Sequence, residues 1–316
     1  MNQLPEKDLP PGRHRLLKEH LMTEIRQEAR ESRENGTRAR RPWLRPALVA
    51  GAVAAVTAVT LTLAVPSGSD GAGPPVAVPS ATVPRTAAAL LEDIALAAEH
   101  ADVPGDIRDD QFVYIKSKVA WTSHDGEGSA KLDPVHQREV WLSVDGKEQG
   151  MVHEPFARSE NLLLEKDTPG NARNTNYRHL QTLPTDPDKM YEWLVKASGD
   201  GSGSKDEANF VLVGDLARES LMPPAQTAAL YRAAARISGV FVIDDAVDAA
   251  GRHGVAVARI DDGQRRELIF DKQTKEFLGE REVAVEDLPW GFKKGEVTAR
   301  TAVLERTVVD ERGERP

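Results

Sequence analysis

Histidines and carboxylates are the side chains that could do chemistry in this sequence, because it contains no cysteine. Without cysteine, a disulfide framework, a thiolate metal site and a cysteine nucleophile are excluded. The eight histidines are scattered, and neither an HExxH motif nor a close pair suited to a metal occurs. His153-Glu154 lacks a second histidine, and His14 and His20 stand six residues apart. We therefore expect no metal site and no cofactor.

The densest group of carboxylates in the C-terminal half is Asp244, Asp245 and Asp248. Paired carboxylates can act as general acid and base or bind calcium. No EF-hand loop surrounds this group, and its spacing favours a solvated turn between strands. The sequence also lacks a G-x-S-x-G elbow, a Walker loop and a dinucleotide-binding fingerprint. These features indicate a protein that is not an enzyme.

The charge is unevenly distributed along the 316 residues, whose formal net charge is −9. Residues 1–45 contain 11 basic and 7 acidic side chains, whereas residues 66–316 contain 30 and 43. An acidic balance argues against binding of nucleic acid, which requires a basic surface. Between the two regions lies a stretch without any charged side chain.

This uncharged stretch predicts a membrane anchor. From Ala47 to Val65 all 19 residues are Ala, Val, Leu, Thr or Gly. At a rise of about 1.5 Å per residue they form a helix of roughly 28 Å, close to the hydrocarbon thickness of a bilayer. We predict a transmembrane helix over residues 46–65. The alternative is a buried helix of a soluble domain.

The residues before this stretch predict its orientation. They are Arg38, Arg40, Arg41, Trp43 and Arg45. The positive-inside rule then places residues 1–45 in the cytoplasm and the C-terminal region outside, with the tryptophan at the inner interface. The arginines are also suited to contact anionic membrane lipids. A cleaved signal peptide would need a charged region of 45 residues, so an uncleaved signal anchor in the cell membrane is favoured.

The cytoplasmic segment contains one amphipathic helix, expected from about residue 13 to residue 32. Leu17, Leu21 and Ile25 recur every four residues and form one apolar stripe. A single helix cannot bury such a stripe against itself. It is therefore either a weakly helical tether or a helix that binds a partner, in which case these three residues are its anchors.

The C-terminal region is divided into a linker and a domain. Residues 66–85 are rich in Pro, Gly and Ser and are expected to be an extended linker. Over residues 86–316 the pattern predicts a helix capped by Thr86, strands between 111 and 144, a polar stretch up to Pro184, three helices between 186 and 239, and about five strands between 240 and 309. This order indicates an α+β domain with a curved antiparallel sheet and helices packed on one face.

Several short strings resemble an uncharacterised family of actinobacterial single-pass membrane proteins. They are LPPGRH at 9–14, HLM at 20–22, PPA at 223–225, ALYRAAA at 229–235, GV at 239–240, GVAV at 254–257, LIFD at 268–271 and LGE at 278–280. The similarity covers nearly the whole chain, and none of the strings is a catalytic motif. Members of this family are often encoded beside extracytoplasmic-function sigma factors, so the resemblance implies a regulatory link to such a factor.

Two functions follow from this layout. A short cytosolic part, one span and an outer sensory domain are similar to membrane-bound anti-sigma regulators, although the His-x3-Cys-x2-Cys motif of the zinc type is absent. The favoured function is an envelope sensor or regulator whose N-terminal helix is linked to a cytosolic sigma factor. The alternative is a membrane-anchored outer binding module or carrier for a lipid or hydrophobic ligand, because its element order resembles the half-barrel of lipoprotein carriers.

Overall fold

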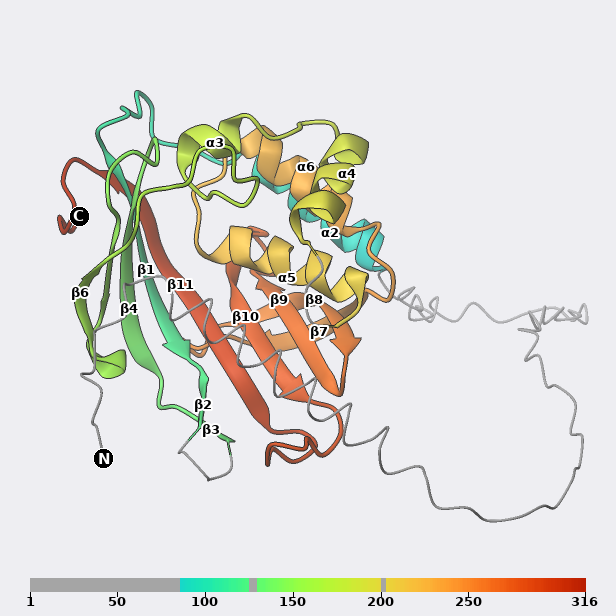
Figure 1. Ribbon diagram of the computed structural model, residues 1–316. Coiled ribbons are helices and arrows are strands. Elements are labelled where there is room, and N and C mark those ends of the chain that lie inside the picture. The colour runs from blue at the N-terminus through green and yellow to red at the C-terminus, as the bar shows by residue number, and fades with distance from the viewer. Residues whose placement is uncertain (1–85, 125–129, 200–202) are drawn as a thin grey trace, which may run out of the picture. The chain divides into compact units, whose positions relative to one another are not determined.

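The computed structural model describes residues 86–124, 130–199 and 203–316, which form an α+β domain (Figure 1). Its centre is a nine-stranded antiparallel sheet with helices packed on one face. No helix within these ranges is long and apolar enough to cross a membrane. The predicted transmembrane helix, the linker and the N-terminal site residues lie outside the described residues. Those site residues are Leu17, Leu21, Ile25, Arg38, Arg40, Arg41, Trp43 and Arg45.

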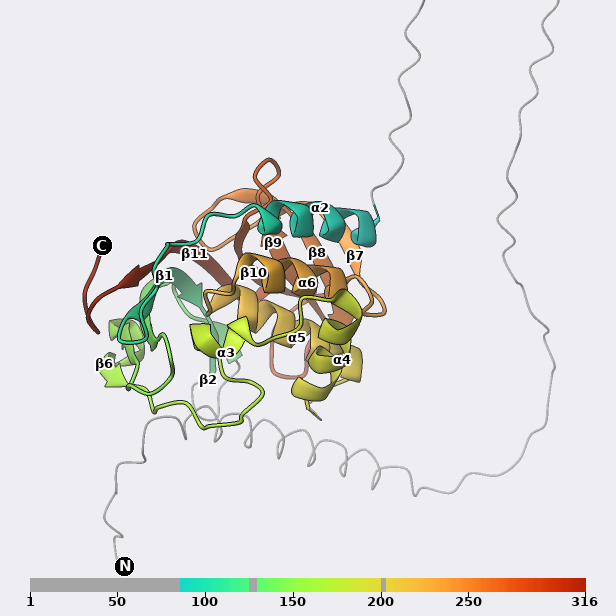
Figure 2. The ribbon, with the colours of Figure 1, turned by 90° about the horizontal axis from the view of Figure 1, so that it is seen from above.

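The first described element is helix α2 (Ala87–Glu99), at the position that the sequence predicts. Thr86 caps it, because the hydroxyl oxygen accepts a hydrogen bond from the N–H of Ala89 at 3.2 Å. Leu90, Leu91 and Ile94 are fully buried on one side of the helix. The helix packs along α6 and lies at one edge of the helical layer (Figure 2).

The first strands are β1 (Phe112–Ala120) and β4 (His136–Ser143), which confirm the strands expected between 111 and 144. A short hairpin of β2 (Thr122–His124) and β3 (Ala130–Leu132) lies between them. The stretch expected to be merely polar instead contains β5 (Met151–Glu154), the 3₁₀ helix η1 (Pro155–Ala157), β6 (Ser159–Leu163) and α3 (Tyr177–Gln181). Strand β6 is an edge strand with mostly exposed residues, so no apolar alternation marks it in the sequence.

The three predicted central helices are confirmed as α4 (Pro187–Ala197), α5 (Lys205–Arg218) and α6 (Pro224–Ala234). Asp186 caps α4 by accepting hydrogen bonds from two backbone N–H groups. Ser204 caps α5, because its hydroxyl oxygen accepts a hydrogen bond from the N–H of Glu207 at 3.1 Å. Proline in the first turn of α4 and α6 costs no hydrogen bond.

The five predicted C-terminal strands are also confirmed. They are β7 (Phe241–Val247), β8 (His253–Asp261), β9 (Gln264–Phe270), β10 (Phe277–Ala284) and β11 (Val297–Val309). The sheet order is β6-β5-β4-β1-β11-β10-β9-β8-β7, so the first and last long strands of the domain pair in its middle. At Gly279 a side chain would collide with the carbonyl of Thr301, which explains the glycine at this irregular point of β10.

The two faces of the sheet are covered differently. On the face that carries the helices, here the inner face, the main apolar core fills the space over β8 and β9. On the opposite, outer face, an aromatic cluster around Tyr114 and Trp141 is covered by residues near the end of the chain. The indole N–H of Trp141 donates to the carbonyl of Glu314 at 2.6 Å. The structure therefore agrees with the α+β fold class expected for residues 86–316.

Candidate functional site

A row of charged side chains crosses the inner face beneath and beside α5. We call it the charge row. It consists of Arg138, Glu154, Glu207, Asp215, Arg218, Glu219, Arg259, Arg266, Glu280 and Glu282. Alternation along β8, β9 and β10 points the charged members to the same face as the apolar core.

At the β8–β9 end of the row, Glu207 in the first turn of α5 joins two strands. Its carboxylate lies 2.7 Å from Nη1 of Arg259 and 3.2 Å from Nε of Arg266. Arg266 also pairs with Glu282 on β10. An acidic residue in the first turn of a helix interacts favourably with the helix dipole. This end of the row therefore fixes the start of α5 on the sheet.

At the end of α5, Arg218 is surrounded by carboxylates. Its Nη1 lies 2.8 Å from Glu280 and its Nη2 lies 2.7 Å from Asp215. Burial by itself lowers the pKa of the Arg218 guanidinium, but Glu280, Glu219 and Asp215 outweigh that effect and raise it. The Trp121 ring lies 5.5 Å from this guanidinium. The positive charge of Arg218 is thus balanced by nearby carboxylates, although its Nε has no hydrogen-bond partner among the described residues.

The β4–β5 end of the row contains a histidine that the sequence analysis did not single out. Arg138 pairs with Glu154 at 2.5 Å, and Nε2 of His136 lies 2.7 Å from the same carboxylate. His136 also stacks on Phe156, with ring centroids 4.4 Å apart. His136 and Glu154 are 18 residues apart, so only the pairing of β4 with β5 brings them together.

The chemistry of this row is that of matched ion pairs. In its described members each carboxylate faces at least one arginine. Buried pairs of this kind orient the elements that carry them, and removing one partner leaves a costly buried charge. No group of three or more His, Asp or Glu side chains able to hold a metal ion occurs in the ranges that the structure describes. The row is therefore best understood as a device that positions α5.

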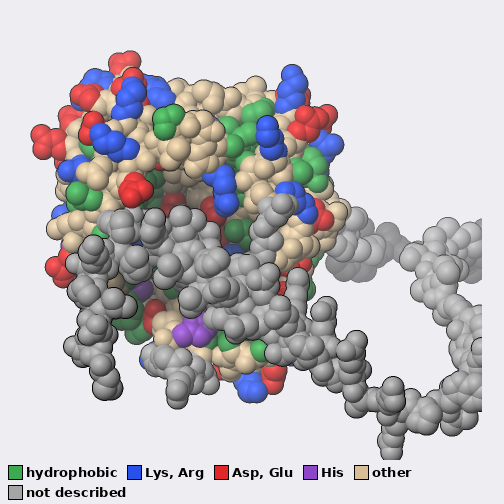
Figure 3. All heavy atoms as spheres, in the orientation of Figure 1, with side chains coloured by type: hydrophobic (Ala, Val, Ile, Leu, Met, Phe, Trp, Pro, Cys, Tyr) green, Lys and Arg blue, Asp and Glu red, His purple; other side chains and the backbone are tan. Residues whose placement is uncertain are grey.

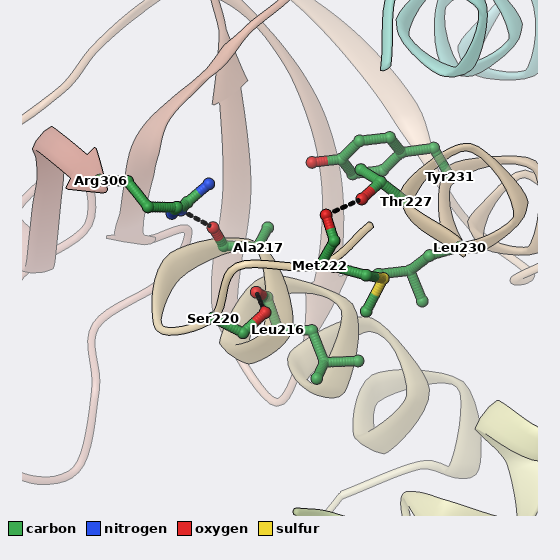
Figure 4. Close-up of a pocket in the computed structure, with 8 residues that line it drawn as sticks. All are labelled: Leu216, Ala217, Ser220, Met222, Thr227, Leu230, Tyr231 and Arg306. Carbon is green, nitrogen blue, oxygen red and sulfur yellow. Dashed lines mark hydrogen bonds between the residues drawn. The ribbon is translucent and has the colours of Figure 1, made fainter. Parts of the chain in front are cut away.

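One arginine of the inner face differs from the row. Arg306 reaches from β11 into a small pocket of about 40 Å³ between α5 and α6 (Figure 4). Its Nη2 donates to the carbonyl of Ala217 at 2.5 Å. No carboxylate of the described residues lies within ion-pair distance of Arg306, and burial lowers the pKa of its guanidinium. The lining residues are Leu216, Ala217, Ser220, Met222, Thr227, Leu230, Tyr231 and Arg306.

A wider and shallower groove of about 540 Å³ lies beside the β2–β3 hairpin. It is lined by Ala130, Lys131, Leu132, Gly291, Phe292, Glu296, Val297 and Arg300. Apolar and charged side chains alternate in this lining. Residues 125–129, between the strands of the hairpin, are outside the described part of the chain.

The outer face contains a further buried carboxylate, Glu139 on β4. Its oxygens accept hydrogen bonds from Arg315 at 2.8 Å and from the Tyr114 hydroxyl at 2.6 Å. The bond from Arg315 is the main reason why the pKa of Glu139 falls to about 2. Arg315 also lies over the Trp141 ring, 5.5 Å from its centroid. Segments near the two ends of the domain are tied together here.

The aspartates considered in the sequence do not form one site. Asp245 is exposed and pairs with His253 and Lys272. Asp248 is buried and accepts hydrogen bonds from the N–H groups of Ala250 and Arg252, at 2.8 and 2.9 Å. The expected turn is wrong for Asp244 and Asp245, which lie in strand β7 where its pairing with β8 is irregular. A turn does begin at Asp248, but the expected solvation is wrong there, because its buried oxygens satisfy the backbone of that turn.

The surface charges of the domain are mixed in sign. In the space-filling view, basic and acidic side chains are interspersed over the uncovered upper part of the face (Figure 3). On this part of the surface no basic stripe of the kind that follows a nucleic acid backbone is visible.

Comparisons with known proteins give only weak likenesses. No family model matches the chain, and no curated protein matches its sequence. Among solved structures, MucB in complex with MucA(peri) has a TM-score of 0.22 and 14% identity, covering 73% of this chain and 57% of that chain. MucB by itself gives 0.22 and 13%, covering 72% and 60%. A LolA superfamily protein from Nitrosomonas europaea gives 0.20 and 12%, covering 69% and 92%.

The chain thus spans less than two thirds of the MucB chains that it matches. TM-scores this low do not establish a shared fold.

Proposed function

We propose that this protein is a non-enzymatic, single-pass membrane protein whose outer domain senses a state of the cell envelope. In this proposal the N-terminal helix, with Leu17, Leu21 and Ile25 as anchors, is linked to a cytosolic sigma factor. The proposal is supported by the uncharged stretch at 47–65, its arginine-rich flank, and the family resemblance of the sequence. The domain at 86–316 begins directly after the proposed linker.

The observation that carries the choice between sensor and carrier is how the inner face of the sheet is filled. Over β8 and β9 it is occupied by packed apolar side chains of α2, α4, α5 and α6. Beneath α5 it is occupied by the charge row. The pocket beside α5 measures about 40 Å³, whereas sites for drug-sized ligands typically measure about 300–1,000 Å³. The groove of about 540 Å³ beside the β2–β3 hairpin is within that range, but it is shallow and its lining includes charged side chains.

A carrier of lipid needs an apolar cavity into which an acyl chain can enter. Paired arginines and carboxylates beneath α5 would have to be separated to open one, and each separation leaves a buried charge unpaired. A domain that recognises a small polar group or a protein surface needs no such opening. We therefore favour the sensor, with the carrier of a hydrophobic ligand as the alternative.

The first experiment is a pull-down of the tagged full chain from detergent-solubilised membranes, with the partners identified by mass spectrometry. The wild type is expected to recover a sigma factor, and Leu17→Asp is expected to lose it. The charge introduced by this variant lies in the apolar stripe, which would have to be buried in the partner's groove.

The matched control is Thr23→Asp, because residue 23 lies on the opposite side of the same predicted helix. This variant is expected to recover the partner at the wild-type level. All three proteins should reach the membrane fraction equally, which is measured by fractionation of the cells. Equal recovery of the same partners by Leu17→Asp would contradict the role of this stripe.

The alternative has its own measurement. Organic extraction of the purified full chain, followed by mass spectrometry, would detect a bound lipid. The sensor proposal expects only detergent and annular lipid, at the level given by a chain truncated after residue 85. Lipid in stoichiometric excess over that control would favour the carrier.

A further inference from the structure

The pocket around Arg306 contains a charged guanidinium that is shielded from solvent by α5 and α6. Arg306 comes from β11, Leu216 and Ala217 come from α5, and Tyr231 comes from α6 (Figure 4). The four arginines of the charge row all have carboxylates within 2.8 Å. Arg306 has none among the described residues, although it faces the same side of the sheet.

Arg306 is also incompletely hydrogen-bonded. The carbonyl of Ala217, in the last turn of α5, accepts from Nη2, so the arginine partly serves as a cap for the end of this helix. A guanidinium has five N–H donors and stays charged in proteins. Its Nε is shielded from solvent and has no hydrogen-bond partner among the described residues. Helix capping therefore uses only some of the N–H donors of the Arg306 guanidinium.

A second donor lies beside it. Tyr231 is buried, and burial raises the pKa of its hydroxyl to about 12, so the hydroxyl keeps its proton at neutral pH. In Figure 4 this hydroxyl is directed toward the side of the pocket on which Arg306 lies. The other two hydroxyls, of Ser220 and Thr227, donate to backbone carbonyls. Arg306 and Tyr231 thus remain as donors for a bound group.

The size of the pocket limits what can bind. With about 40 Å³, the pocket is far smaller than sites for drug-sized ligands, so a compact group is the kind of ligand that suits it. A carboxylate group has three heavy atoms, carries one negative charge, and accepts hydrogen bonds in the plane that a guanidinium offers. The apolar sides of Leu216, Met222 and Leu230 close the remaining walls.

We propose that the pocket between α5, α6 and β11 is a binding site for a carboxylate group, held by the guanidinium of Arg306 and the hydroxyl of Tyr231. This site goes beyond the proposed function and depends on neither the membrane anchor nor the sigma factor. The carboxylate can belong to a free small anion or to an acidic side chain of a bound polypeptide. The two sources share the same chemistry and are separated by the experiment.

The experiment is isothermal titration of the purified full chain with sodium formate at constant ionic strength. Wild type is expected to bind formate saturably, and Arg306→Met is expected to weaken the binding at least tenfold. Sodium gluconate is the matched salt, because it carries the same charge on a molecule too large for the pocket. Equal titration by formate and gluconate would overturn the proposal.

Two further variants keep the test independent of folding. Tyr231→Phe removes one hydroxyl and keeps the ring, so a loss of about threefold in formate affinity is expected. Lys118→Met removes an exposed positive charge of β1 outside the pocket and should bind formate as the wild type does. Circular dichroism and the unfolding midpoint check that each variant is folded. Formate affinity unchanged in both Arg306→Met and Tyr231→Phe would contradict the site.

The source of the carboxylate is tested by competition. A short blocked peptide containing aspartate is added to the formate complex, with the same peptide containing asparagine as control. Displacement of formate by the aspartate peptide alone identifies a side chain of a polypeptide as a suitable ligand. Formate binding without displacement by either peptide identifies a free anion. Absence of saturable formate binding to wild type up to about 100 mM would overturn the proposal in both forms.

Discussion

Two arginines near the end of α5 lie in contrasting surroundings on the same inner face. Arg218 belongs to the charge row and has Glu280 and Asp215 within 2.8 Å. Arg306 donates a hydrogen bond to the carbonyl of Ala217, the residue before Arg218, and contacts no carboxylate of the described residues. The pKa of the first guanidinium is raised by its partners, whereas burial lowers that of the second.

Buried charge therefore serves two purposes in the domain. In the row, charges compensate one another and hold α5 on the sheet. In the pocket, the charge is left available, at a cost in stability that a bound anion can offset. Removal of charges from each region in turn tests this contrast.

The largest effect is expected in the row. Glu280→Gln removes a carboxylate that lies 2.8 Å from Arg218 and leaves that guanidinium buried with fewer partners. The free energy of unfolding is expected to fall by about 3 kcal/mol. Urea denaturation of the full chain measures it, with the exposed Glu276→Gln as matched control and little change expected there. A loss below about 1 kcal/mol for Glu280→Gln would show that Asp215 and Glu219 compensate alone.

The next effect concerns the outer face and its dependence on pH. Folded Glu139 has a pKa of about 2 against a usual value of 4.5, chiefly because of the bond from Arg315. The carboxylate therefore contributes stability above about pH 4.5, and this contribution is lost as the pH falls to about 2. Glu139→Gln should lower the free energy of unfolding at neutral pH by about 2 kcal/mol.

The same variant should flatten the fall in stability between pH 4.5 and pH 2, as measured by urea denaturation at a series of pH values. Arg315→Gln is the matched variant, because it removes the positive charge beside Glu139 and keeps the carboxylate. An unchanged pH profile in both variants would mean that other carboxyl groups determine the acid behaviour.

A smaller effect, and one of opposite sign, is expected in the pocket. Arg306→Met removes a buried charge without a carboxylate partner and keeps much of the side-chain volume. In buffer without small carboxylates the free energy of unfolding should stay the same or rise by about 1 kcal/mol. Urea denaturation beside Glu280→Gln makes the comparison direct. A loss of more than about 2 kcal/mol would show that capping of α5 is the main task of Arg306.

The smallest effect is expected at Asp245. Its contacts with His253 and Lys272 are exposed, so Asp245→Asn should leave the unfolding midpoint unchanged. Asp248→Asn, three residues further on, removes a buried carboxylate that holds a turn and should lower the midpoint clearly. Similar midpoints for the two variants would contradict the distinction between exposed and buried pairs.

Much of the fold could be predicted because its signals are local. Thr86, Asp186 and the prolines at 223 and 224 mark helix starts through their own backbone chemistry. The period of two after Gly239 marks five strands. Strand β6 could not be predicted, because at the exposed edge of the sheet its side chains need no alternation.

The candidate site could not be predicted to the same extent. Asp244, Asp245 and Asp248 attract notice in the sequence because they are close in the chain. The row and the pocket instead join residues far apart, such as Arg218 with Glu280, 62 positions away, and Arg306 with Ala217, 89 positions away. No local spacing reveals such pairs.

Most helices, most strands and the start of the domain could therefore be predicted from the sequence alone. Caps, turns and apolar periods act over a few residues and are independent of the rest of the chain. Which buried arginines have carboxylate partners depends on the tertiary structure. That outcome depends on the register of β10 against β11 and on where α5 lies across the sheet, since an ion pair forms only between groups brought within about 4 Å.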